Sequence, residues 1–118
     1  MNGAVLDDAV ERSAMHIRAR LAGRSPQIAV LLGSGWGGLA HGVQDALTLA
    51  YADLPAFPRP GVEGHAGWLL LGRIGGRDLA VLSGRQHTYE DGDPAAMKGA
   101  LRTLARLGVR VLVQTNAA

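Results

Sequence analysis

The sequence contains no cysteine among its 118 residues, and only 4% of them are aromatic. Without cysteine there is neither a disulfide framework nor a thiolate metal site. So few aromatic side chains leave no stacking platform for nucleic-acid bases. The longest apolar runs, such as residues 28–32, are far shorter than the roughly 20 residues of a membrane-spanning helix. Residues 1–10 carry two aspartates and lack the basic start of a secretory signal. We therefore expect a cytoplasmic protein that binds neither membrane nor nucleic acid.

Lysine is almost absent as well, because Lys98 is the only lysine and the other eleven basic residues are arginines. The formal net charge is only +2. Arg102, Arg106 and Arg110 recur every four residues, which is typical of a solvated helix face. No metal site is expected, since the histidines form no close-spaced ligand pair. These histidines are His16, His41, His65 and His87.

Glycine, in contrast, is abundant. The 17 glycines lie singly or in short clusters between the apolar runs, as is typical of turns and loops. Helical spacing of apolar side chains predicts an N-terminal helix within residues 1–24, closed by Gly23. Its apolar positions are Leu6, Val10, Ala14, Ile17 and Leu21. A second helix is expected to begin at Asp93 and Pro94, with a capping oxygen followed by a proline, and to end at Gly108.

Five apolar runs predict strands. The run 28–32 is apolar throughout, as is typical of a strand buried on both faces. Gly75 and Gly76 join two further runs into a β-hairpin. The expected strands are 28–32, 46–51, 68–71, 79–82 and 109–113, with a short helical turn at 39–43. The fold class is therefore α/β, a mixed, partly parallel central β-sheet flanked by helices.

A glycine-rich turn, residues 33–38, directly follows the first buried strand. Gly33 and Gly35 let the backbone approach an anion closely, and Ser34 adds a hydroxyl donor. The turn also matches G-x-G-x-x-G, with Asp53 at the distance of a ribose-binding acid. A non-catalytic nucleotide-binding module and a turn without a ligand are therefore alternative interpretations.

Three polar side chains, Arg85, His87 and Tyr89, alternate after the strand at 79–82. In an extended chain they share one face. A guanidinium, an imidazole and a phenol on one face suit a phosphate beside a sugar hydroxyl. Glu90 follows and is placed to orient His87. The alternative is an exposed edge of mixed polar residues.

Two more segments are candidates. His65 is held between glycines in a loop, where it is accessible, although such a histidine is also common on an ordinary surface. Thr115, Asn116 and Ala117 follow the last strand. Ligands of parallel α/β sheets bind beyond the carboxyl ends of strands, so the turn at 33–38 and the end of the last strand are expected to share one pocket.

From about residue 26 to the last residue, the ordered set of segments resembles the trimeric purine nucleoside phosphorylases. The similarity is carried by GSGWGG (33–38), FP (57–58), GHAG (64–67), GRQHTYE (84–90), LGV (107–109) and TNAA (115–118). It implies phosphorolysis of purine nucleosides to free base and ribose 1-phosphate, in a homotrimer, with inorganic phosphate as co-substrate and no cofactor.

The resemblance also implies residue roles. Phosphate would be held by Ser34, His65, Arg85, Gln86, His87 and the backbone N–H of Ala117. Tyr89 would contact the ribose, and Asn116 would shape the turn beneath the nucleoside. Glu90 would support His87 from behind. Gly33 and Gly35 would supply loop backbone.

Two features depart from the family pattern. Residues 91–94 read DGDP where the family usually has glycine, an aromatic residue and proline. The resemblance also covers only the family's N-terminal portion. Residues 1–118 are thus expected to form a single partial domain, with the phosphate-binding half at 26–118 and no purine-binding residues. The isolated chain would be weakly active or inactive. Alternatives are a methylthioadenosine phosphorylase-like enzyme and an inert fragment that associates with full-length subunits.

Overall fold

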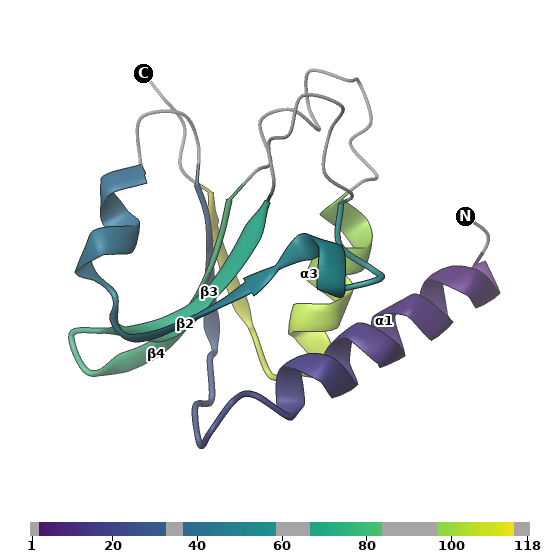
Figure 1. The fold of residues 1–118 in the computed structure, drawn as a ribbon, viewed down its shortest axis with the longest axis horizontal. Coiled ribbons are helices and arrows are strands. Elements are labelled where there is room, and N and C mark those ends of the chain that lie inside the picture. Colours follow the sequence, from purple (N-terminus) through teal and green to yellow (C-terminus); the bar gives the residue numbers. More distant parts are fainter. Residues whose placement is uncertain (1–2, 33–36, 59–66, 84–96, 115–118) are drawn as a thin grey trace.

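Five strands of the computed structural model form one mixed sheet in the order β2-β3-β4-β1-β5 (Figure 1). The structure describes residues 3–32, 37–58, 67–83 and 97–114. The strands are β1 (Ile28–Leu31), β2 (Gln44–Ala50), β3 (Trp68–Ile74), β4 (Arg77–Leu82) and β5 (Val111–Gln114). The helices are α1 (Gly3–Arg18), α3 (Lys98–Arg106) and the 3-10 segments η1 (Gly37–Gly42) and η2 (Tyr51–Asp53).

The centre of the sheet is parallel and one side of it is antiparallel. Strand β1 pairs in parallel with both β4 and β5. Strands β2, β3 and β4 form an antiparallel meander. The turn between β3 and β4 lies at Gly75 and Gly76, whose φ angles of 59° and 80° permit the tight turn. The predicted hairpin and the mixed, partly parallel sheet are therefore confirmed.

Apolar side chains cover both faces of the sheet. Helices α1 and α3 lie on one face (Figure 1), where Ile17 and Leu104 pack against Ala29 and its neighbours. On the opposite face Val30 and Val81 belong to a second buried cluster. Burial on both faces explains why the first strand is apolar at every position, as predicted.

The two helices also contact each other through charged side chains. Arg102 lies 3.8 Å from Asp7, and Arg106 pairs with Glu11. The predicted solvated arginine stripe therefore also links α3 to α1. All four side chains are about half exposed, so these ion pairs contribute little to stability.

Several element boundaries differ from the prediction. Helix α1 ends at Arg18, whereas the sequence predicted a helix as far as Gly23, which instead adopts a φ of 85° in the following turn. Gly108 closes α3 with a φ of 104°, as expected. The predicted helix start at Asp93 and Pro94 lies outside the described residues. Within the described residues, no helix is both long enough and apolar enough to cross a bilayer.

A buried serine ties α1 to the chain that follows η2. Ser13 is fully buried, and its Oγ accepts a hydrogen bond from the Ala56 N–H at 2.9 Å. Gly99 of α3 contacts the same residue, because a Cβ there would lie 2.3 Å from the Ala56 carbonyl oxygen. The segment around Ala56 is therefore clamped between both helices.

We expect Ser13→Ala to lower the free energy of unfolding by about 1–3 kcal/mol, because a buried N–H loses its acceptor. Urea denaturation measures this loss. The matched control is Thr103→Val, which removes an equally buried hydroxyl that only donates to Gly99 of its own helix. Equal destabilisation by the two variants would contradict the role of Ser13.

Candidate functional site

The carboxyl ends of the three parallel strands lie in one row across the end of the sheet. In this subsection and the next, "this edge" means that row of strand ends, and not the outermost strands β2 and β5. Leu31 of β1 is opposite Leu82 of β4 and also opposite Gln114 of β5. The pairing continues to the next residue, because the Leu32 N–H donates to the Leu82 carbonyl at 2.9 Å. Each of these strands leads within two residues into a segment that the sequence predicted to hold phosphate, at positions 33, 84 and 115.

The fourth predicted segment joins the sheet at this same edge. Strand β3 runs antiparallel to β4, so its first residue, Trp68, lies beside the end of β4. The Ser83 N–H donates to the Trp68 carbonyl at 3.1 Å, and the Trp68 N–H donates to Ser83 Oγ at 3.2 Å. Gly67, two residues after His65, is therefore also at this edge.

The predicted site residues themselves lie outside the described residues. They are Gly33, Ser34, Gly35, His65, Arg85, Gln86, His87, Tyr89, Glu90, Asn116 and Ala117. Their roles stay predictions. The structure establishes that the four chain segments carrying them leave from, or return to, one edge of one sheet. This is the arrangement in which parallel α/β sheets hold their ligands.

Beneath this edge lies a residue that the sequence did not single out, Tyr51. Its exposed fraction is 2%, and its ring packs against Phe57 with centroids 5.2 Å apart. Its N–H donates to the Gly67 carbonyl at 3.1 Å. A Cβ on Gly67 would lie only 2.1 Å from the Tyr51 ring, so glycine is required for this close approach.

The Tyr51 hydroxyl is buried and lies near the Ser83 backbone, but it forms no well-aligned hydrogen bond with any described residue. Burial raises the pKa of Tyr51 strongly, and the backbone of Ser83 opposes that rise only in part. Tyr51 therefore contacts the two chain segments, at Gly67 and at Ser83, that lead to the predicted His65 and Arg85. In the sequence it was only the last residue of a predicted strand, and no local pattern signalled this contact.

The sheet topology contradicts the nucleotide-binding module. That interpretation needs the strand that comes next in the sequence after β1 to lie beside it in parallel and to be reached through a crossover helix. Instead β1 is followed by the six-residue η1 and then by β2. Strand β2 pairs antiparallel with β3 and is the outermost strand of the sheet, three positions away from β1. Asp53, the predicted ribose-binding acid, is exposed at the end of η2, the 3-10 segment that follows β2.

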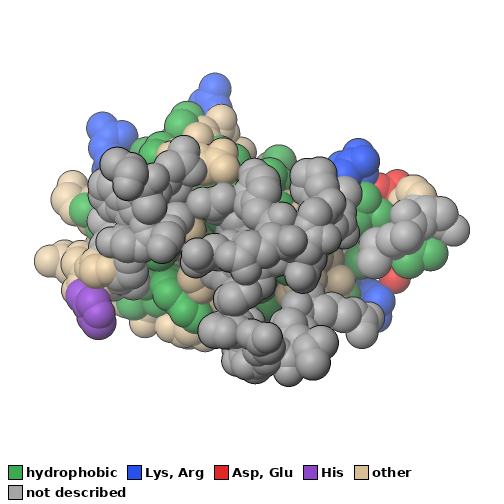
Figure 2. Space-filling model, turned by 90° about the horizontal axis from the view of Figure 1, so that it is seen from above, with side chains coloured by type: hydrophobic (Ala, Val, Ile, Leu, Met, Phe, Trp, Pro, Cys, Tyr) green, Lys and Arg blue, Asp and Glu red, His purple; other side chains and the backbone are tan. Residues whose placement is uncertain are grey.

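The described side chains do not add a metal site or a basic patch to this edge. Across the described ranges no three His, Asp or Glu residues gather as metal ligands. Figure 2 is viewed from the side of the strand ends, and the described Lys and Arg side chains visible in it lie apart from one another near the outline of the molecule.

Comparisons with known proteins support the resemblance. The chain is 41% identical over 113 residues to purine nucleoside phosphorylase 1 of Bacillus subtilis (strain 168), a match that covers 96% of this chain and 41% of that relative. No family model matches the chain. The chain thus spans about two fifths of the length of the curated relatives it matches.

Solved structures give the same result for the fold. Isoform 2 of purine nucleoside phosphorylase from Schistosoma mansoni, in complex with cytosine and ribose-1-phosphate, has a TM-score of 0.82 and 35% identity over 94% of this chain and 39% of its own. The S. mansoni enzyme in complex with inosine has a TM-score of 0.79 and 38% identity over 94% of this chain and 38% of its own. The predicted similarity to the purine nucleoside phosphorylases is confirmed as a partial match.

The buried phenol gives a pH-dependent prediction. Because burial raises the pKa of Tyr51, the folded state keeps the proton that the unfolded chain releases near pH 10. Stability from this group is complete below pH 10, and we expect it to fall as the pH rises above 10. Urea denaturation at a series of pH values measures this fall.

Tyr51→Phe is expected to lack that part of the alkaline loss. Below pH 9 it should differ from wild type by less than about 1 kcal/mol, since the hydroxyl forms no well-aligned hydrogen bond that the substitution would remove. The control is Tyr89→Phe, which removes the only other tyrosine and should keep the fall. An identical pH profile for Tyr51→Phe and wild type would refute the assignment.

Proposed function

We propose that this chain is the phosphate-binding portion of a purine nucleoside phosphorylase. The observation that carries the proposal is the common sheet edge, where the ends of β1, β4 and β5 meet the start of β3. The similarity to the B. subtilis relative covers 113 of the 118 residues, so it includes at least the three internal segments, which follow β1, follow β4 and precede β3.

In the proposed site, Ser34, Arg85 and His87 donate hydrogen bonds to one phosphate, together with His65, Gln86 and the backbone N–H of Ala117. An arginine that is always charged suits a dianion, because charge-assisted hydrogen bonds are about twice as strong as neutral ones. Gly33 and Gly35 let the backbone approach the same anion. Tyr89 and Asn116 face the nucleoside, and Glu90 holds the His87 ring.

The chemistry follows from where charge develops. A phosphate oxygen forms a bond to the anomeric carbon while the bond from that carbon to the purine nitrogen breaks. The electron pair of the broken bond leaves on the base, which takes up a proton. Positive charge develops on the sugar in between, so a phosphate fixed beneath the ring is both nucleophile and counter-charge. The reaction requires neither a metal nor an organic cofactor.

The similarity supports further parts of the proposal. The relatives reported above are purine nucleoside phosphorylases, which favours this branch over methylthioadenosine phosphorylase. We also propose a cytoplasmic location and, for the full-length family assembly, a homotrimer. Because the chain spans about two fifths of its relatives, the purine-binding groups are assigned to the remaining part of such an enzyme.

We expect the chain to bind inorganic phosphate, and Arg85→Ala to weaken that binding by about 10- to 100-fold, the usual effect of losing a hydrogen bond to a charged group. Isothermal titration with phosphate measures the affinity. The matched control is Arg77→Ala, because Arg77 is exposed at the first residue of β4, whereas Arg85 follows the last residue of β4 in the sequence. Equal weakening by both variants, or no phosphate binding by the wild type, would contradict the proposed site.

Turnover by the isolated chain should be far slower than that of a full-length relative. Loss of the groups that protonate the departing base is expected to lower kcat by at least about 100-fold. The assay follows hypoxanthine release from inosine and phosphate, with the B. subtilis enzyme as reference. Comparable turnover by the two proteins would show that base departure needs no group beyond this chain.

A further inference from the structure

The hydrogen-bonded ladder between β3 and β4 continues one residue beyond β4, to the pair Trp68 and Ser83. A regular antiparallel pair of this kind exchanges two backbone hydrogen bonds. Here the first is regular, because the Ser83 N–H donates to the Trp68 carbonyl at 3.1 Å. For the second, the Trp68 N–H donates at 3.2 Å to Oγ of Ser83, which itself donates to the Trp68 carbonyl at 3.4 Å. The side chain of Ser83 thus replaces its own carbonyl as the second acceptor.

The other side of β4, which faces β1, keeps a backbone pairing at the same level. The Leu32 N–H, one residue beyond β1, donates to the Leu82 carbonyl at 2.9 Å. The change from carbonyl to hydroxyl therefore occurs on the side of β4 that faces β3. It occurs at the residue directly before the predicted phosphate-binding segment 84–90, so it coincides with the point where that segment leaves the sheet.

The ring of Tyr51 supports this pair from the helix face of the sheet. Tyr51 belongs to the buried cluster on that face. Its N–H bonds to the Gly67 carbonyl, and its ring fills the space that a side chain on Gly67 would need. Its hydroxyl lies near the Ser83 backbone. The start of β3 and the residue after β4 therefore rest on one buried, rigid group.

We propose that Ser83 is a positioning residue of the phosphate site, whose hydroxyl ends the β3–β4 ladder at Trp68 and so sets the direction in which the chain leaves β4 toward Arg85. The inference rests on the proposed function, since it assigns Arg85 and His65 to phosphate. Arg85 comes two residues after Ser83, and His65 comes three residues before Trp68. The pair therefore links the two segments at their bases.

The hydroxyl acts by keeping the ladder from closing in the regular way. Without it, the Trp68 N–H regains an acceptor if the carbonyl of residue 83 takes up the second backbone bond of the pair. That bond requires the peptide group between residues 83 and 84 to turn, which redirects the chain that follows. Replacing Ser83 by alanine is thus expected to cost little stability, because a hydrogen bond is regained, and to displace the Arg85 segment.

A matched control is provided by Ser13, whose hydroxyl serves a backbone N–H in the same way at another place. Its Oγ accepts the Ala56 N–H at 2.9 Å and is fully buried, whereas Ser83 is half-buried. Ser13 lies on α1, away from the row of strand ends. Loss of its hydroxyl should therefore lower stability more than the loss of the Ser83 hydroxyl does, without changing the phosphate site.

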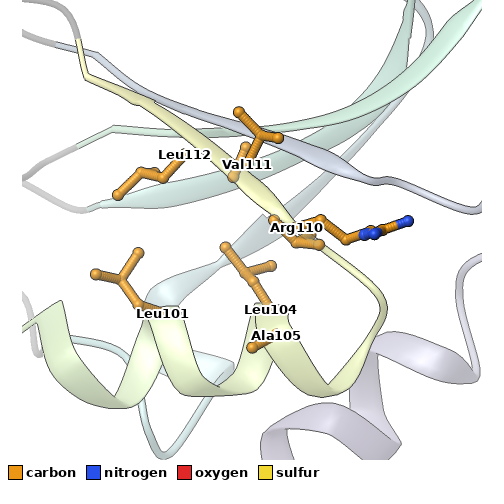
Figure 3. Close-up of a pocket in the computed structure, with 8 residues that line it drawn as sticks. Leu101, Leu104, Ala105, Arg110, Val111 and Leu112 are labelled. Carbon is orange, nitrogen blue, oxygen red and sulfur yellow. The ribbon is translucent and has the colours of Figure 1, made fainter.

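Phosphate affinity reports on the strand ends and not on the apolar groove between β5 and α3. That groove has a volume of about 140 Å³, and Leu101, Leu104 and Leu112 lie around it (Figure 3). The guanidinium of Arg110 points away from Leu101 and Leu112 (Figure 3). Such an apolar lining does not suit a dianion, which would lose its hydration there without gaining donors.

The experiment measures phosphate affinity by isothermal titration and stability by urea denaturation for Ser83→Ala, Ser83→Thr and Ser13→Ala. We expect Ser83→Ala to weaken phosphate binding by about tenfold, because small displacements of positioned groups are costly. Ser83→Thr keeps the hydroxyl and should restore the wild-type affinity. Ser13→Ala should reduce stability more than Ser83→Ala, yet bind phosphate as the wild type does.

The ring signals of His65 and His87 in nuclear magnetic resonance spectra give a second measurement, which needs no phosphate. In the phosphate-free chain Ser83→Ala should shift both signals, whereas Ser83→Thr should leave them at their wild-type positions. His16, on α1, is the internal reference for the Ser83 variants. The rescue by threonine separates positioning by the hydroxyl from a general loss of packing.

Three results would overturn the proposal: wild-type phosphate affinity in Ser83→Ala, equal weakening in Ser83→Thr or Ser13→Ala, or ring signals of His65 and His87 that do not move in Ser83→Ala. If the wild type itself binds no phosphate, the proposed function fails. The ring signals then still decide whether the Ser83 hydroxyl sets the course of the two segments, so the two failures are distinguishable.

Discussion

The double parallel pairing of β1 is the constraint on which the rest of the structure depends. Because β1 runs in parallel with β4 on one side and β5 on the other, three carboxyl ends lie in one row. The antiparallel return of β3 brings a fourth chain segment to the same row. The helices, the two buried clusters and Tyr51 all support this arrangement. A site assembled at that edge draws its precision from strand register and not from the loops themselves.

Patterns that depend on local sequence predicted local structure well. The apolar face of α1 was visible at helical spacing, and the β-hairpin was signalled by two consecutive glycines. Adjacency between distant strands is not encoded in this way. The sequence predicted a strand near residue 46, yet nothing local places β2 beside β3 and three strands away from β1. For that reason the G-x-G-x-x-G match suggested a nucleotide module that the topology contradicts.

In the candidate site, too, the sequence predicted some features and missed others. Buried strands followed by polar turns predicted that the segments after β1 and β5 would share one edge, and the register confirms that convergence of strands. The roles of Ser34, Arg85 and His87 stay predictions, since they depend on side-chain placement beyond the strand ends. Tyr51 was missed because its partner, Gly67, is a contact across the fold: a glycine and a tyrosine 16 positions apart carry no periodic signal.

Strand β1 is the first strand to be synthesised, but its pairing is completed late because its two partner strands lie far along the chain. Ile28 of β1 is paired with Leu79 and with Val111, 51 and 83 residues later in the chain. Pairings between distant residues form slowly, whereas the β3–β4 hairpin needs only its own turn. On the ribosome, we expect this apolar segment, which is made early, to wait for its first neighbour until β4 has emerged and for its second until β5 has emerged. During that interval it is exposed to the same aggregation hazard as any unpaired apolar strand.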